Sequence, residues 1–281
     1  MQKVKYLTFE QEGFEQIVKY SIDFKNYSNN FIVEIGSSNN SYYLNDELNR
    51  FQGILVDGSL EKIMSYKSKF PFLPVCKYIT SQNVCDILKE HNVPKDFYML
   101  NLDIDGPDFF VLMAILKEYR PKIIVSEYNE KIPYPVKYAI KNDPNYKWGW
   151  NHNYGYSAAA VEDILTNFNY SIDNLIVNNI FLIRNDNGEK PNIEKIPELY
   201  KSGYLDRKEW LNNGENGTLQ PWNKDIDHIH NCKTKEEVEE VWRKYFLENK
   251  NSNTGNSMSD EINNYVMNDE YEKHLTEFLN N

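Results

Sequence analysis

The stretch FIVEIGSSNNSYYLNDELNRFQGILVDGS, residues 31–59, decides the fold class. An apolar, β-branched run at 31–35 is followed directly by Gly36, and a second apolar run at 53–56 ends at Asp57. This order predicts a strand, a tight glycine turn, a helix and a second strand, which is the opening unit of a doubly wound sheet. In such a sheet the acid after the second strand binds the two hydroxyls of a ribose, so we expect an adenosine site at Asp57.

The number of glycines in the turn distinguishes two classes of adenosine ligand. A dinucleotide requires the second and third glycines of G-x-G-x-x-G for its pyrophosphate and for close helix packing, and only Gly36 is present. S-adenosylmethionine carries no phosphate, so one glycine turn with the polar residues 37–41 suffices for its amino-acid end. We therefore expect S-adenosylmethionine rather than a nicotinamide or flavin cofactor. The alternative is a plain strand-to-helix turn in which Asp57 is a solvated loop acid.

The chain continues to residue 184 with apolar runs that alternate with helical patterns. Further strands are expected at 73–79, 97–103 and 121–127, and helices at 43–51, 60–70, about 80–90, 109–119 and 157–168. Runs at 170–177 and 180–184, joined by Asn178-Asn179, predict an antiparallel hairpin. The fold class is therefore α/β: a doubly wound, Rossmann-like, seven-stranded and mostly parallel sheet that ends in this hairpin.

Acidic residues end three of the predicted strands, namely Asp57, Asp103 with Asp105, and Glu127. The carboxyl ends of parallel strands meet at one edge of a sheet, so we expect these acids to converge on one rim. The long segment 128–156, rich in Pro, Tyr, Trp and Asn, follows and predicts a lid or substrate loop. Its aromatic residues either stack on a flat acceptor or merely order the loop.

Composition divides the chain into three parts. Residues 1–30 contain a helical pattern at 8–26, residues 31–185 form the cofactor-binding domain, and residues 186–281 are charged and polar. In the last part we expect helices at 234–248 and 260–279 and no further strand. Three roles are open for this helical extension: it covers the substrate side of the domain, it mediates a homodimer, or it is a solvated tail.

Net charge and hydropathy indicate which kinds of partner and which compartment to expect. A formal net charge of −11 argues against binding of nucleic acid or an anionic membrane. The sequence contains no apolar run of about 18 residues, and its first residues lack the apolar core of a signal peptide, so we expect a cytoplasmic protein. Its three cysteines have no metal-type spacing, which favours reduced thiols.

Five stretches carry a resemblance to known proteins between about residues 31 and 184. They are VEIGSSNN, GILVDGS, LNLDIDGPDFFVL, PKIIVSEYN, and HNYGYSAAAVEDIL with the NNIFLIR hairpin. Together they resemble the class I S-adenosylmethionine-dependent methyltransferases, and among these the FkbM-like group. The sequence departs from that group at Asn39-Asn40, where an acidic-glycine pair is usual.

The resemblance implies methyl transfer to a small-molecule acceptor, by O-methylation of a sugar or a hydroxylated precursor in glycan or natural-product synthesis. N-methylation of a small amine or amide is one alternative, because the sequence does not identify the acceptor atom. A non-catalytic domain that uses the fold to bind a partner protein is another.

The resemblance also implies site residues. Cofactor contacts fall on Glu34, Gly36 and Ser37 at the methionine end, on Asp57, Gly58 and Ser59 at the ribose, on Thr80 and Ser81 at the adenine edge, and on Asp103 at the methyl group. Candidates for the catalytic base are Asp103, Asp105, Glu127 and His152.

A divalent metal ion is a further expectation. Asp103, Asp105, Glu127 and Asn129 resemble the oxygen-rich set of metal-dependent O-methyltransferases, which implies Mg or Mn, with Asp103, Glu127 and His152 as the metal ligands. The alternatives are structural: Asp105 caps a helix, Glu127 hydrogen-bonds a loop, and His152 is an ordinary loop histidine.

Overall fold

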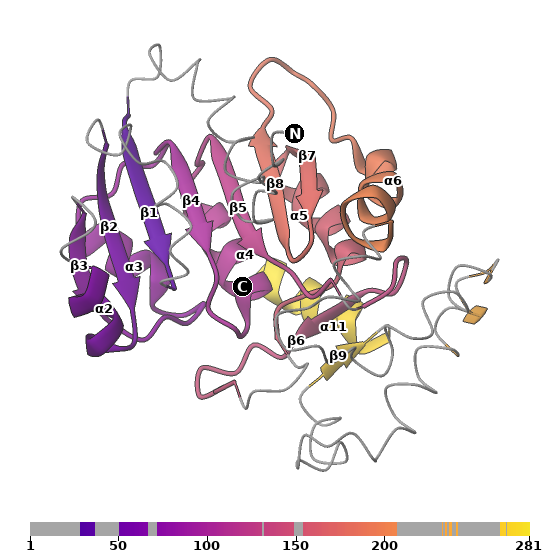
Figure 1. Cartoon of the computed structure of the whole chain (residues 1–281), viewed down its shortest axis with the longest axis horizontal. Helices are drawn as coiled ribbons and strands as arrows, with labels where there is room; N and C mark the ends of the chain where they lie inside the picture. The colour runs from indigo at the N-terminus through magenta and orange to yellow at the C-terminus, as the bar shows by residue number, and fades with distance from the viewer. Residues whose placement is uncertain are drawn as a thin grey trace, which may run out of the picture.

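The computed structural model describes residues 29–36, 51–66, 72–130, 132–148, 154–206, 265–267 and 269–281, with single positions between 232 and 240. A seven-stranded sheet in the order β3-β2-β1-β4-β5-β8-β7 forms its centre (Figure 1). The strands are β1 (Phe31–Ile35), β2 (Gln52–Asp57), β3 (Leu73–Cys76), β4 (Met99–Leu102), β5 (Ile123–Glu127), β7 (Tyr170–Ile176) and β8 (Asn179–Arg184). β8 is antiparallel to both of its neighbours, whereas β1 to β5 pair in parallel. The predicted α/β sheet with its terminal hairpin is confirmed.

The two faces of the sheet have separate apolar cores because side chains alternate along each strand. Val33 and Leu100 face one core, which is covered by α3 (Val84–Glu90), α4 (Asp108–Glu118) and α5 (Val161–Phe168). Ile32 and Met99 face the other, which contains Ile63 of α2 (Leu60–Tyr66). Every residue of β4 and β5 is buried, and most are apolar, as expected for the centre of a parallel sheet.

The chain changes direction along the sheet at β1, which lies between β2 and β4. The ladder continues past the strand ends, because Gly36 N–H donates to Val56 O at 2.9 Å and Asp103 N–H donates to Ile35 O at 3.0 Å. These hydrogen bonds keep the carboxyl ends of β1, β2 and β4 side by side at the same edge of the sheet. In open α/β sheets a ligand binds in the crevice outside such a point.

The hairpin turn lies one residue earlier than the predicted Asn178-Asn179. Val177 and Asn178 join β7 to β8, and Val177 adopts a φ of +54°. Positive φ is unusual for a β-branched residue. Here Val177 is buried against the sheet, and its N–H donates to Gly203 O at 3.1 Å. Packing against a distant segment therefore outweighs the local preference for asparagine.

A second, two-stranded sheet lies outside the predicted pattern. β6 (Tyr138–Ile140) forms within the segment predicted as a loop and pairs antiparallel with β9 (Tyr265–Met267). The expectation of no strand after residue 185 is therefore wrong at β9. Two strands of three residues carry little local signal, and each depends on a partner far away in the sequence.

The last helix is part of the domain body rather than a solvated tail. In α11 (Asp269–Asn280), Tyr271 donates its hydroxyl to Asp163 Oδ2 at 2.8 Å, and its ring centre lies 5.7 Å from that of Phe109. Lys117 Nζ donates to Phe278 O at 2.5 Å. Figure 1 shows α11 and β9 beside β6, below the right half of the sheet.

Three further elements precede this helix: a 3₁₀ turn (Ile193–Lys195), α6 (Ile196–Tyr200) and a π-helical turn (Lys201–Leu205).

The predicted cap at Thr234 is present, because Thr234 and Glu237 exchange hydrogen bonds between side chain and backbone at 3.2 and 3.3 Å. The helix predicted at 8–26 lies outside the described residues, as does the helix predicted at 43–51 except for its last residue, Phe51. None of the helices in the described ranges combines the length and hydrophobicity of a membrane span.

Candidate functional site

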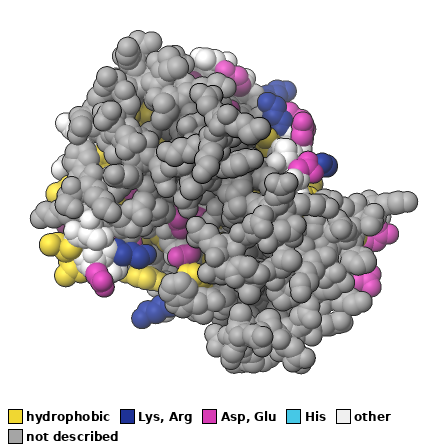
Figure 2. Space-filling model, viewed as in Figure 1, with side chains coloured by type: hydrophobic (Ala, Val, Ile, Leu, Met, Phe, Trp, Pro, Cys, Tyr) yellow, Lys and Arg dark blue, Asp and Glu magenta, His cyan; other side chains and the backbone are white. Residues whose placement is uncertain are grey.

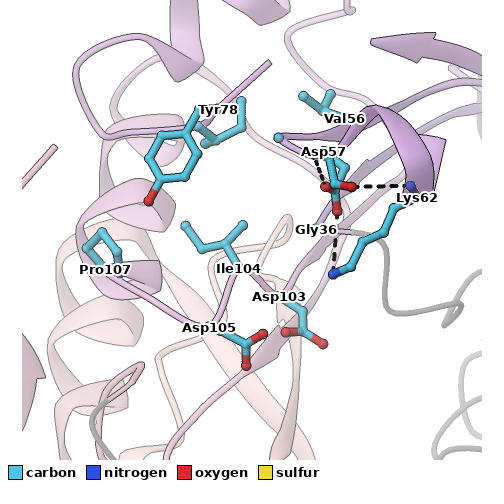
Figure 3. Close-up of a pocket in the computed structure, with 12 residues that line it drawn as sticks. Gly36, Val56, Asp57, Lys62, Tyr78, Asp103, Ile104, Asp105 and Pro107 are labelled. Carbon is cyan, nitrogen blue, oxygen red and sulfur yellow. Dashed lines mark hydrogen bonds and ion pairs between the residues drawn. The ribbon is translucent and has the colours of Figure 1, made fainter. Parts of the chain in front are cut away.

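A cavity of about 300 Å³ opens at the carboxyl ends of β1, β2 and β4 (Figure 3). Figure 3 shows Asp57 and Lys62 on one side of it and Asp103 and Asp105 on another. Five of the nine predicted cofactor residues line the cavity, together with seven others. The full lining is Gly36, Val56, Asp57, Gly58, Ser59, Lys62, Tyr78, Ile79, Asp103, Ile104, Asp105 and Pro107.

Asp57 is held at the cavity by the turn that follows β2. The backbone N–H of Ser59 donates to Asp57 Oδ1 at 2.6 Å, and Lys62 Nζ lies 4.0 Å from Oδ2. With 8% of its surface exposed, the carboxylate is nearly buried. A fixed, partly neutralised carboxylate with few rotamers is well suited to accept hydrogen bonds from a pair of hydroxyls.

Gly36 forms the floor of the crevice, and no other residue fits there. Its φ is +75°, and an ideal Cβ would lie 1.5 Å from Asp103 O. The missing side chain therefore allows the ends of β1 and β4 to approach each other.

Glu34 does not line the cavity. It is 1% exposed within the sheet, where Asn101 Nδ2 donates to its Oε1 at 2.7 Å. Ser37, the other residue predicted for the methionine end besides Gly36, lies outside the described residues. The placement of that end of the cofactor stays a prediction.

The predicted adenine contacts Thr80 and Ser81 do not line the cavity either. Thr80 N–H donates to Asn83 Oδ1 at 2.8 Å, and Ser81 Oγ donates to Asn142 Oδ1 at 2.6 Å. The preceding residues Tyr78 and Ile79 line it instead. β3 ends at Cys76 rather than at the predicted residue 79, so the residues just past its end face the cavity.

Tyr78 is the aromatic one among the six lining residues that the sequence did not predict, the others being Val56, Lys62, Ile79, Ile104 and Pro107. Its ring lies over Gly58, where an ideal Cβ would come within 3.1 Å of Tyr78 Cδ2, and its hydroxyl donates to the carbonyl of Tyr146. An aromatic residue just past a strand end on the ligand-binding edge is the signal that could have identified it.

The strand order brings Asp103, Asp105 and Glu127 together. One carboxylate oxygen from each lies within 4.8 Å of the others. Asn178 Nδ2 donates to Glu127 Oε1 at 2.8 Å, and Oε2 of the same carboxyl has no hydrogen-bond donor among the described residues. Asp103 and Asp105 of this cluster lie on a different side of the cavity from Asp57, so the site has two separate acidic groups (Figure 3).

Burial dominates the electrostatics of this cluster. It raises the pKa of Glu127 well above its usual value, and the neighbouring charges of Asp103 and Asp105 raise it further. Burial likewise raises the pKa of Asp108, which is fully buried, to about 8. Burial and the two neighbouring acids therefore disfavour the charged form of Glu127, and a cation held among the three acids would favour it. Figure 2 shows acidic side chains near the centre of this face of the molecule, next to basic and hydrophobic ones.

The remaining predicted site residues lie in or beside the segment 128–156. His152 lies outside the described residues. Asn129 bonds to the end of the segment: its N–H donates to Tyr156 O at 2.7 Å, and its Nδ2 donates to Tyr154 O at 3.2 Å. Asn129 therefore holds the segment in place.

The aromatic residues of the segment do not form one stacking surface. Tyr128 and Tyr138 are fully buried and cannot stack on an acceptor, so that expectation is wrong for these two. Trp148 packs edge-on against Tyr154, with ring centres 6.5 Å apart. Among the described aromatic residues of the segment, the interpretation as packing is favoured.

Comparison with known proteins gives likeness in structure alone. No protein-family model matches the chain, and no curated protein matches it. Among solved structures, an S-adenosylmethionine-dependent methyltransferase from Clostridium acetobutylicum ATCC 824 is 11% identical, with a TM-score of 0.39 over 66% of this chain and 94% of that one. The methyltransferase domain of bacterial CtHen1-C is 12% identical, with a TM-score of 0.38 over 64% and 100% of the two chains. A hemolysin candidate from Streptococcus thermophilus is 12% identical, with a TM-score of 0.40 over 74% and 78%.

Proposed function

We propose that the chain is an S-adenosylmethionine-dependent methyltransferase that acts on the oxygen of a small hydroxylated acceptor, such as a sugar. The observation that carries the proposal is the cavity at the switch point of the sheet, with the fixed carboxylate of Asp57 on one side and the Asp103–Asp105 pair on another. An adenosine ligand and an acceptor can each be bound by one of these two acidic groups.

The cofactor half is built from the first two strands. Asp57 accepts hydrogen bonds from the ribose hydroxyls, and Gly36 allows the methionine end to approach the backbone. The ring of Tyr78 with the apolar side chains of Ile79 and Ile104 forms the wall for the adenine. When bound, S-adenosylmethionine supplies the methyl group, whose bond to sulfur breaks as its bond to the acceptor oxygen forms.

The acceptor half uses the second acidic group. Asp103 and Asp105 line the cavity and take the proton that the acceptor hydroxyl releases. Glu127 is more deeply buried and not part of the lining, and its carboxyl group lies beside those of Asp103 and Asp105. Alignment of the acceptor and exclusion of water are the other contributions of the protein.

The same three acids fit a divalent cation. Mg²⁺ and Mn²⁺ prefer carboxylate oxygens, and Asp103, Asp105 and Glu127 each offer one within 4.8 Å of the others. Glu127 Oε2 has no hydrogen-bond partner among the described residues and would be available to such a cation. Such a cation would bind the acceptor oxygen and lower its pKa. The metal thus belongs to the proposal, with Asp105 in addition to the expected Asp103 and Glu127.

N-methylation is the second candidate, and the acidity of the cluster favours it. Three carboxylates around one point attract a cationic amine and can then accept its proton. A screen with radiolabelled S-adenosylmethionine against sugars, hydroxylated aromatics and small amines separates the two candidates by the product formed.

Calorimetry with S-adenosylmethionine tests the cofactor half. We expect Asp57→Ala to weaken binding by about 10- to 100-fold, because hydrogen bonds to a charged group are lost. Asp86→Asn, an exposed acid on α3 that pairs with Lys89, is the control and should bind like the wild type. Equal affinity of wild type and Asp57→Ala would contradict the ribose contact, and tight binding of NAD to the wild type would contradict the cofactor assignment.

A further inference from the structure

Asp108 is a buried acid to which the proposed reaction gives no role. It is the first residue of α4 and 0% exposed, and no described cation forms an ion pair with it. Removing a carboxyl group from water in this way costs free energy unless hydrogen bonds compensate. Its partners therefore indicate what the residue does.

Two backbone N–H groups donate to this carboxyl, and both belong to the turn that leaves β4. Ile104 N–H donates to Oδ1 at 2.9 Å, and Gly106 N–H donates to Oδ2 at 2.9 Å. Each oxygen thus has its own donor. Between the two donors lies Asp105, which adopts a φ of +52°. This left-handed conformation is unfavourable for a residue with a side chain, and local hydrogen bonds are needed to maintain it.

The turn is also fixed at its two ends. Asp103 N–H bonds to Ile35 O, and the carbonyl of Gly106 accepts from Gly155 N–H at 2.9 Å. The first contact joins the turn to β1, and the second joins the turn to the end of the segment 128–156. Asp108 supplies the hydrogen bonds between these ends, where Ile104 and Asp105 line the cavity.

We propose that Asp108 is a positioning residue of the site. Its two hydrogen bonds hold Asp105 in the left-handed conformation, which keeps the carboxylates of Asp103 and Asp105 near that of Glu127 and keeps Ile104 in the cavity wall. The inference rests on the proposed function, because the positioned residues are those of the proposed site.

The chemistry of the side chain makes the role testable by graded substitution. A carboxyl group accepts on both oxygens, whereas an Asn side chain has one oxygen and one NH₂ group that cannot accept. Asp108→Asn therefore retains one of the two hydrogen bonds, and Asp108→Ala retains neither. A matched control is Asp163→Asn on α5, because Asp163 is also largely buried and bonds Lys137 and Tyr271 away from the cavity.

The experiment measures S-adenosylmethionine affinity by calorimetry and Tm by calorimetric melting for the wild type and the three variants. We expect Asp108→Ala to bind at least about tenfold more weakly, Asp108→Asn to be intermediate, and Asp163→Asn to lose Tm but not affinity. Hydrogen exchange of the Ile104 and Gly106 amides, followed by NMR, should show one amide deprotected in Asp108→Asn.

The outcomes separate this inference from the proposed function. If the Asp108 variants melt earlier but bind the cofactor like the wild type, Asp108 only stabilises the start of α4 and the inference is wrong. If the wild type itself does not bind S-adenosylmethionine, the proposed function fails and this inference fails with it. Should Asp108→Ala not fold, the affinity and amide exchange of Asp108→Asn decide.

Discussion

The backbone of Gly36 lies directly against the carbonyl group of Asp103. An ideal Cβ on residue 36 would come within 1.5 Å of the oxygen and 2.5 Å of the carbon, and the φ of Gly36 is +75°. β1 and β4 are neighbours at the point where the chain reverses its direction along the sheet. This contact therefore sets the distance between the cofactor turn and the acid-bearing turn.

Gly36→Ala should be among the most damaging substitutions in the domain. The new Cβ forces the two strand ends apart, so we expect the free energy of unfolding to fall by more than about 3 kcal/mol and cofactor binding to be lost. Urea denaturation and calorimetry measure the two effects. Gly188→Ala is the matched control: its φ is +78° and an added Cβ meets no atom within 4 Å, so only the backbone cost of about 1 kcal/mol is expected. Equal losses in the two variants would contradict the role of close approach.

Asp105 combines an unfavourable backbone conformation with a carboxylate of the proposed site, and a pair of substitutions separates the two. Asp105→Gly and Asp105→Ala both remove the carboxylate and should lose Mn²⁺ affinity equally. At a φ of +52°, glycine is the better tolerated residue, so we expect Asp105→Gly to be more stable than Asp105→Ala by about 1 kcal/mol in urea. Equal stability would mean that the left-handed conformation is not maintained in solution.

Glu127 is expected to favour metal binding at the expense of stability. Glu127→Gln removes a buried acid that lies close to Asp103 and Asp105 and keeps an oxygen for Asn178. In chelator-treated protein we expect Tm to rise by about 2–4 °C, because glutamine removes the cost of burying an acid beside Asp103 and Asp105. Mn²⁺ affinity, followed by electron paramagnetic resonance, should fall at least about tenfold. Unchanged Mn²⁺ binding in Glu127→Gln would place the ion elsewhere.

The thiol of Cys85 should be unreactive at ordinary pH. Burial, followed by the charge of Glu118, raises its pKa to about 11, and its Sγ donates to Ala114 O at 3.3 Å. Since the thiolate is the reactive form, we expect labelling at pH 8 to be roughly 100-fold slower than for an ordinary thiol and to accelerate about tenfold per pH unit up to pH 11. Rates with a disulfide reagent in a protein with both Cys76→Ser and Cys232→Ser, in which Cys85 is the remaining thiol, measure this. A rate that levels off near pH 9 would contradict the raised pKa.

The order of the elements in the main sheet could be predicted from the sequence because each depends on local patterns. Strands buried on both faces are continuous apolar runs, and the glycine after β1 and the acids after β2, β4 and β5 stand at their carboxyl ends. Parallel pairing of β4 with β5 then places Asp103 close to Glu127. Element boundaries were less accurate, as at β3, which ends at Cys76 so that Tyr78 and Ile79 line the cavity.

Other features of the fold were decided only by the tertiary structure, because they depend on contacts between residues far apart in the sequence. β6 forms because β9 pairs with it, Val177 takes the turn position because its backbone bonds to Gly203, and Tyr78 faces the cavity because β3 ends early. Asp108 appeared in the sequence as one more acid of a motif, and its burial turned it into an acceptor for two backbone groups. By itself the sequence determined the sheet and the edge at which its acids gather, because local pattern and chain direction fix both. Packing decided which of those acids face the cavity and which are buried as supports, because burial and hydrogen-bond partners exist only in the folded chain.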